Sequence, residues 1–250
     1  MIYLAAAIWI NVIVLMAWGI DYLWTRMVKP RYFNAALLPG TMVATLGRIV
    51  GLLITGAKVN NTALMSDDDQ GAPQTDLQYE PKIPFFGPML VGFIPLVAIG
   101  TAIYLLVMYL YEPLAQQLPV EKISAELPAT GAAFWDQLRH LIDLTEATYV
   151  TLMKADYDNW QVCAAIYLMI CLAIRSAPYR GNERGHFGAI ATTAAIVALA
   201  GTVTTRPAEL IEQSWPILVV TVGWLSLLLM ASLIARGIVA IVRGLAKGGG

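Results

Sequence analysis

The sequence predicts an all-α polytopic membrane protein, because strong hydrophobicity, few charges and apolar stretches of membrane-spanning length occur together. Hydrophobic residues make up 58% of the 250 residues and charged residues only 13%, about half the share in ordinary soluble domains. The mean hydropathy is +0.65. This composition argues against a soluble enzyme, a disordered chain and a disulfide-rich mini-protein. A net charge of −1 without a long basic run argues against nucleic-acid binding.

A bilayer core about 30 Å thick needs about 20 apolar residues in a helix. Six stretches reach or approach that length, so we expect one integral membrane domain, residues 1–250. The predicted transmembrane helices are residues 2–20, 35–56, 85–111, 160–174, 187–205 and 216–235. The first stretch has no basic residue ahead of it and no small-residue cleavage site behind it, so we interpret it as a retained helix rather than a signal peptide.

Basic residues after the membrane segments indicate the orientation. Those after the fourth and sixth segments favour a cytoplasmic location, which together with six crossings puts both termini inside. Those after the first segment favour the opposite. The two sets are Arg175, Arg180, Arg184, Arg236, Arg243 and Lys247 against Arg26, Lys29 and Arg31. Four tryptophans near segment ends are expected at the membrane interfaces, namely Trp18, Trp24, Trp160 and Trp215.

Two connections between the segments are long enough to carry structure. Residues 58–65 and 75–82 are half-polar and predict a short β-hairpin in the loop after the second helix, with the Asp67-Asp68-Asp69 run as a solvated turn. In the second connection, an apolar face at helical spacing predicts an amphipathic helix over about residues 133–156. That face comprises Phe134, Leu138, Leu141, Ile142, Thr145, Tyr149, Leu152 and Met153.

The chain has few residues that suit metal or cofactor binding. Its two cysteines, Cys163 and Cys171, are eight positions apart on one predicted helix, about 12 Å and too far for a disulfide, so we expect free, small packing residues. With only two histidines, sites built on several imidazoles are not expected, and we predict no cofactor. Asp136, His140 and Asp143 share one helix face, but a solvated face with ion pairs such as Arg139 with Asp143 is the preferred interpretation.

Arg48 is the most informative single residue, because it lies within an apolar segment where an unpaired arginine costs at least about 2.5 kcal/mol. Snorkelling towards water is one interpretation. A polar constellation inside the bundle is the other. The remaining segments carry no carboxylate, so the constellation requires a partner from a loop that dips between the helices.

The stretch from Pro39-Gly40-Thr41 to Gly56 resembles the zinc-site helix of the site-2-protease-like intramembrane metalloproteases and their prokaryotic relatives. Those helices carry P-G-T followed by H-E-L-x-H and an apolar run that ends in glycine. In this register Ala44 and Arg48 stand at the histidine positions and Thr45 at the glutamate position. The similarity continues at Pro81-Lys82-Ile83-Pro84 and at residues 176–185, where Asn182 occupies the position of the third metal ligand, an aspartate.

The resemblance implies a pseudoenzyme, since catalytic zinc needs three protein ligands and a glutamate as general base, and Ala44, Thr45 and Arg48 supply none of them. We therefore expect no metal and no catalytic residue. We expect a degenerate site in which Arg48 takes the place of the metal charge and is met by Asn182 or Glu183.

The function expected from these features is a non-catalytic structural, assembly or regulatory subunit of a larger membrane complex, in the inner membrane of a prokaryote. Small residues in the fifth segment favour close helix packing within the chain or with other membrane subunits; they are Gly188, Ala191, Ala195, Ala198 and Gly201. Two alternatives stay open. One is an intramembrane protease with unrecognised ligands, and the other is a solute or proton transporter that uses Arg48.

Overall fold

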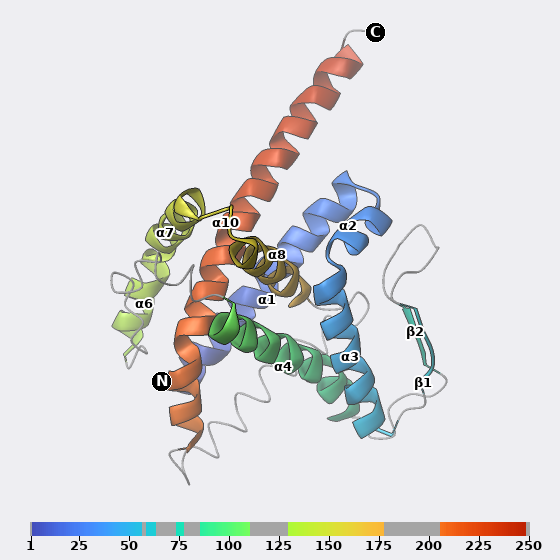
Figure 1. The fold of residues 1–250 in the computed structure, drawn as a ribbon, viewed down its shortest axis with the longest axis vertical. Coiled ribbons are helices and arrows are strands. Elements are labelled where there is room, and N and C mark those ends of the chain that lie inside the picture. The colour runs from blue at the N-terminus through green and yellow to red at the C-terminus, as the bar shows by residue number, and fades with distance from the viewer. Residues whose placement is uncertain are drawn as a thin grey trace.

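The computed structural model describes residues 2–56, 59–63, 74–77, 86–110, 130–177 and 206–248. Figure 1 shows helices that pack around the lower part of one very long helix. The elements are α1 (Ile2–Met27), α2 (Pro30–Ala36), α3 (Leu38–Ile54), β1 (Val59–Ala63), β2 (Gln74–Leu77), α4 (Phe86–Tyr109), α6 (Gly131–Arg139), α7 (Leu141–Lys154), α8 (Trp160–Arg175) and α10 (Arg206–Gly248).

Three helices in the described part of the chain are long and apolar enough to cross a membrane, at Ala5–Met27, Leu90–Tyr109 and Ser214–Val242. The predicted second and fourth segments correspond to shorter apolar helices, Leu38–Ile54 and Trp160–Arg175. The predicted fifth segment lies outside the described residues. Six crossings therefore remain a prediction.

The predicted helix over residues 35–56 is wrong at its beginning, because α2 ends at Ala36 and α3 begins at Leu38. Leu37 between them has φ −99° and ψ 21°. Leu38 immediately precedes Pro39, which occupies the first turn of α3. Proline suits a first turn, where its missing N–H would have no helical partner.

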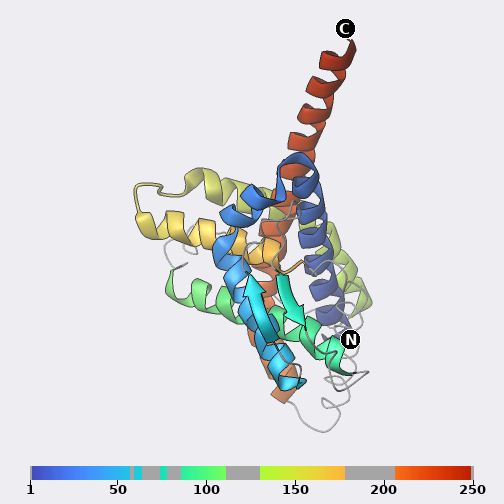
Figure 2. The ribbon, with the colours of Figure 1, turned by 90° about the vertical axis from the view of Figure 1, so that its right-hand side faces the viewer.

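Helices α1 and α10 pack side by side and run in the same direction. The contact pairs rise together along both helices: the Trp9 and Trp215 ring centroids are 5.5 Å apart, and Trp24 Nε1 donates to Ser232 Oγ at 2.8 Å. Figures 1 and 2 show that both helices run upwards from the end of the molecule at which the N-terminus lies. If both helices cross a bilayer, residues 2 and 248 lie on opposite sides of it. The prediction that both termini lie inside does not fit this register.

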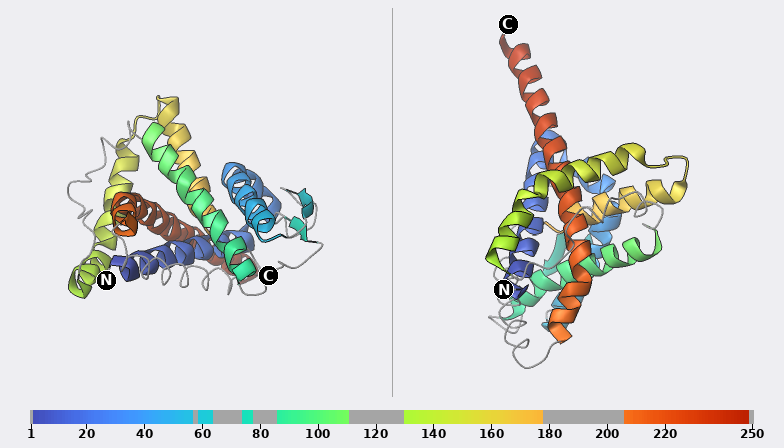
Figure 3. Two further views of the ribbon diagram at one scale, coloured as in Figure 1. Left: turned by 90° about the horizontal axis from the view of Figure 1, so that it is seen from below. Right: turned by 90° about the vertical axis from the view of Figure 1, so that its left-hand side faces the viewer.

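Helices α3 and α4 form an antiparallel pair, because a Cβ added at Gly47 would meet Pro95 whereas one at Gly51 would meet Val91. Helix α8 packs against both of them. Helices α4 and α8 run across the direction of α10 in Figures 2 and 3, so the candidate spans do not form one bundle of aligned helices.

The predicted continuous helix over residues 133–156 is two helices, which meet at His140. The face of α7 that packs within the chain is not the predicted apolar face: Ile142, Tyr149 and Met153 are exposed, whereas Leu144, Thr148 and Thr151 are buried. The reason is a glycine on the neighbouring helix α10, because a Cβ at Gly223 would lie 2.6 Å from Thr148 Oγ1. Because Gly223 has no side chain, threonines of α7 can pack against α10. The hydroxyls of Thr148 and Thr151 donate to backbone carbonyls of their own helix.

The structure contradicts the surroundings predicted for Trp215 and for Cys163. Trp215 is fully buried against Trp9 in the core between α1 and α10 instead of marking an interface. Trp24 is partly buried beside Phe33 and hydrogen-bonded to Ser232. Trp18 and Trp160 are exposed. Cys163 is exposed rather than packed, and its Sγ donates to the Tyr157 carbonyl; Cys171 is buried.

Strands β1 and β2 pair antiparallel, with Thr62 opposite Thr75. They lie within the connection where the sequence indicates a hairpin. The Asp67-Asp68-Asp69 run between them lies outside the described residues.

Candidate functional site

The positions that resemble a metal site lie on helix α3 and pack between helices. Ala44 is buried in an apolar cluster with residues of α4 and α8, including Ile99, Ala165 and Met169. Thr45 is also buried, and Arg48 is half-buried one turn further along α3. Asn182 and Glu183 lie outside the described residues, so their pairing with Arg48 stays a prediction.

Glycines give α3 its close contacts on two sides. A Cβ at Gly47 would lie 2.7 Å from Pro95 Cα, and one at Gly40 would lie 2.2 Å from the backbone oxygen of Cys171. Gly51 makes a further tight approach, 3.2 Å from Val91 Cα. Positions 40, 44, 47 and 51 repeat at helical spacing, and small residues there let α4 and α8 approach. Ala44 thus belongs to a packing stripe.

Sequence reasoning missed this stripe although its signal was visible. Gly47-x-x-x-Gly51 is a small-xxx-small pattern within an apolar segment, the type of sequence that brings membrane helices together. The similar pattern predicted in the fifth segment lies outside the described part of the chain; its residues are Gly188, Ala191, Ala195, Ala198 and Gly201.

A polar cluster joins α1, α2 and α8 near the N-terminal end of α3, where a Cβ at Gly40 would lie 3.0 Å from Arg175 Cγ. Its centre is Arg175, whose guanidinium donates to Asn34 Oδ1 and lies 3.7 Å from a carboxylate oxygen of Asp21. The Arg175 and Asp21 side chains are only 13% and 17% exposed. The guanidinium also lies 5.8 Å from the Phe33 ring centroid, at cation–π distance.

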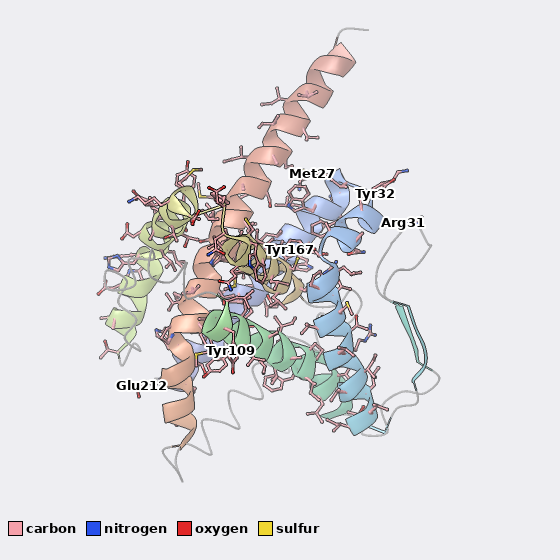
Figure 4. The ribbon with its side chains drawn as sticks, in the orientation of Figure 1. Met27, Arg31, Tyr32, Tyr109, Tyr167 and Glu212 are labelled. Atoms are coloured by element: carbon pink, nitrogen blue, oxygen red, sulfur yellow. The ribbon has the colours of Figure 1, made fainter. Side chains whose placement is uncertain are left out.

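The cluster is continuous with α10 through aromatic side chains. Trp24 stacks on Phe33, with ring centroids 6.0 Å apart and planes at 4°, and its Nε1 donates to Ser232 Oγ. Tyr167, labelled in Figure 4, donates from its hydroxyl to the Ala36 carbonyl at 2.9 Å. One arginine therefore connects three helices, and Trp24 connects them to a fourth.

The centre of this cluster is an ion pair between Arg175 and Asp21, in which each charge is offset by the other. Asp21 and Arg175 are close enough to offset each other's charge, and truncation of one partner would leave the other buried, which is costly. We interpret the cluster as a structural junction. In the sequence, Arg175 counts among the basic residues after the fourth segment, and Asp21 was not a candidate site residue. The available signal was an aspartate directly after the first predicted segment and within the candidate span Ala5–Met27.

The Asp136, His140 and Asp143 set does not come together in the described residues. His140 Nδ1 lies 2.7 Å from Asp143 Oδ2, and both side chains are exposed. Arg139 lies over the Trp135 ring instead of pairing with Asp143 as predicted. Across the described ranges no group of three or more His, Cys, Asp or Glu side chains has the geometry to hold a metal ion.

Fold and site together define a largely helical protein with three helices that could cross a membrane, a glycine-lined helix packing and a buried ion pair. No model of a known family, no curated protein and no solved structure matches the chain.

Proposed function

We propose that the protein is a non-catalytic subunit of a larger membrane assembly and that it holds a partner protein through the part of α10 beyond Arg236. The observation that carries this proposal is the register between α1 and α10. It puts the apolar run 237–242 of α10, which is followed by Arg243, past the level at which α1 would leave the membrane.

The level of the membrane follows from α1. Its candidate span, Ala5–Met27, has 23 residues, about 34 Å of helix and enough for a bilayer core of about 30 Å. Trp9 is level with Trp215, and Trp24 is level with Ser232. The residue of α10 level with Met27 is therefore about Ala235.

Beyond this level α10 continues for about 18 Å, over residues 237–248. Figures 1 and 2 show this part projecting past all other described elements. Three of its large apolar side chains, Ile238, Ile241 and Val242, are 57%, 65% and 59% exposed. Apolar surface of this size in the headgroup layer or in water is unfavourable unless another protein covers it.

The non-catalytic part of the proposal is supported by the packing of α3. Ala44 and Thr45, which stand at ligand and base positions in the resemblance to site-2-protease-like enzymes, are buried between helices. The space around Ala44 is filled by side chains of α4 and α8. We propose accordingly that the chain is a pseudoenzyme of that type in a prokaryotic inner membrane.

The proposal is tested by replacing large side chains beyond the membrane level and within it. The test variant is Ile238→Ala/Ile241→Ala, and the matched control is Ile8→Ala/Leu15→Ala, which truncates exposed apolar side chains inside the candidate span of α1. Each protein is extracted from its native membranes in mild detergent, and the mass of the particle is measured.

We expect a particle well above the 27.2 kDa of one chain for the unaltered protein and the control. Loss of two buried interface side chains should weaken the test variant's assembly at least tenfold. A monomeric unaltered protein, or equal loss in both variants, would contradict the proposal.

A further inference from the structure

We propose that α3 and α4 share a hinge at the point where Gly47 meets Pro95. The part that moves is the end of α3, residues 48–54, together with the beginning of α4, residues 86–94, and we name it the distal unit. It turns relative to α8 and to the rest of α3 and α4. The inference is independent of the partner proposed above, because it concerns a movement within the chain.

Pro95 weakens α4 at the hinge. It lies inside the helix and has no N–H, so the carbonyl of Val91 does not receive the hydrogen bond that another residue at position 95 would donate. Sharp helix bends occur mostly at such prolines. The backbone of α4 is therefore least constrained by its own hydrogen bonds between residues 91 and 95.

The two helices meet at the hinge through backbone atoms. A Cβ at Gly47 would lie 2.7 Å from Pro95 Cα, and one at Gly51 would lie 3.2 Å from Val91 Cα. Interdigitated side chains hold most packed helices in one arrangement, because a change of angle requires them to repack. Glycine has no side chain to repack, and it also constrains the backbone of α3 less than other residues do. Gly47 is thus suited to act as a pivot.

The apolar cores divide at the same level. The part of α4 after Pro95 packs in the larger cluster with α8, through Ile99, Ile103 and Leu106. The part before Pro95 contributes Val91 to a separate cluster with Leu52 of α3. The distal unit therefore has packing of its own, as expected for a part of a protein that moves as a unit.

Arg48 directly follows the pivot and belongs to the distal unit. It is half-buried, so a turn at Gly47 changes how deeply its guanidinium lies. The hinge thereby couples the position of the distal unit to the surroundings of the charged residue within α3.

The experiment measures distances between spin labels by pulsed electron paramagnetic resonance, on the purified full chain in lipid nanodiscs. One label is attached to the native Cys163 of α8, which is exposed, whereas Cys171 is buried. The second label is attached at Leu53→Cys in the distal unit or, as the matched control, at Leu46→Cys before the pivot. Leu53 and Leu46 are 61% and 59% exposed, and their spacing of seven places them on one face of α3.

A turn of about 20° at Gly47 would move residue 53, about 9 Å further along the helix, by about 3 Å. We expect the distance distribution to residue 53 to be broader than that to residue 46 by about this amount. Pro95→Ala restores the backbone donor of α4 and should remove the extra width, whereas Gly100→Ala, on the other side of the hinge, should keep it. Equal widths at residues 46 and 53 would overturn the proposal. So would a width at 53 that Pro95→Ala leaves unchanged or that Gly100→Ala reduces equally.

Discussion

At the residue scale, the resemblance to a metal site and the packing of α3 assign different roles to the same helix. Ala44 and the glycines at 40, 47 and 51 share a small-residue stripe, and each glycine faces backbone of a neighbouring helix at short distance. Such contacts tolerate no added atom unless one helix moves. Close packing is therefore the role that the described neighbours of this stripe support.

The first prediction concerns Gly47 on α3, with Gly100 on α4 as its control. Gly47→Ala places a Cβ 2.7 Å from Pro95 Cα, and we expect it to lower the free energy of unfolding by about 1–3 kcal/mol. Gly100→Ala meets nothing within 4 Å and should raise it by about 0.5–1 kcal/mol, since alanine favours helix. Unfolding in mixed detergent micelles measures both. Equal effects of the two substitutions would mean that α3 and α4 do not meet at Gly47.

The features that could be predicted from the sequence depend on local solvation, whereas those that could not depend on contacts between distant parts of the chain. Composition and hydrophobic runs report solvation, which acts locally, so the existence of the apolar helices was predictable. The Asp21 and Arg175 pair joins residues far apart in sequence. No local pattern predicts such a pair, because it depends on how α1, α2 and α8 meet.

At the element scale, α7 shows how a neighbour decides which face of a helix is buried. Its apolar pattern points to Ile142, Tyr149 and Met153, which are exposed. The packed face carries Thr148 because α10 offers a glycine there. Periodicity predicts that a helix has an apolar and a polar face. It cannot show how closely the neighbouring helix can approach each face.

The second prediction is a cross-link between α7 and α10. Thr145 Oγ1 and Ser226 Oγ are 2.6 Å apart, so cysteine sulfurs at these two positions would lie within reach of each other, since a disulfide needs side chains that meet and a bond of about 2.0 Å. Thr145→Cys/Ser226→Cys, in a Cys163→Ser background, should form a disulfide on mild oxidation, which is detected by altered gel mobility. The control Glu146→Cys/Ser226→Cys starts from an exposed neighbour and should form little. Comparable yields would contradict the described docking of α7.

At the scale of the whole molecule, the parallel contact between α1 and α10 is the feature from which the functional account follows. If α1 crosses a bilayer, this register leaves residues 237–248 of α10 beyond the level at which α1 ends. Lengths of apolar runs cannot reveal this register. They measure each helix by itself, and they extend the candidate span of α10 to Val242.

The most direct test of the central claim is the environment of residue 238 in native membranes. A spin label is placed at Ile238→Cys or, as a lipid-facing reference, at Leu15→Cys, both with Cys163→Ser. Collision with oxygen reports lipid, and collision with a nickel chelate reports water. We predict that the label at 238 is shielded from both in the native assembly and becomes accessible to the nickel chelate when the purified chain is reconstituted alone. High oxygen access at 238, matching that at 15, would show that this part of α10 lies in lipid and would contradict the account.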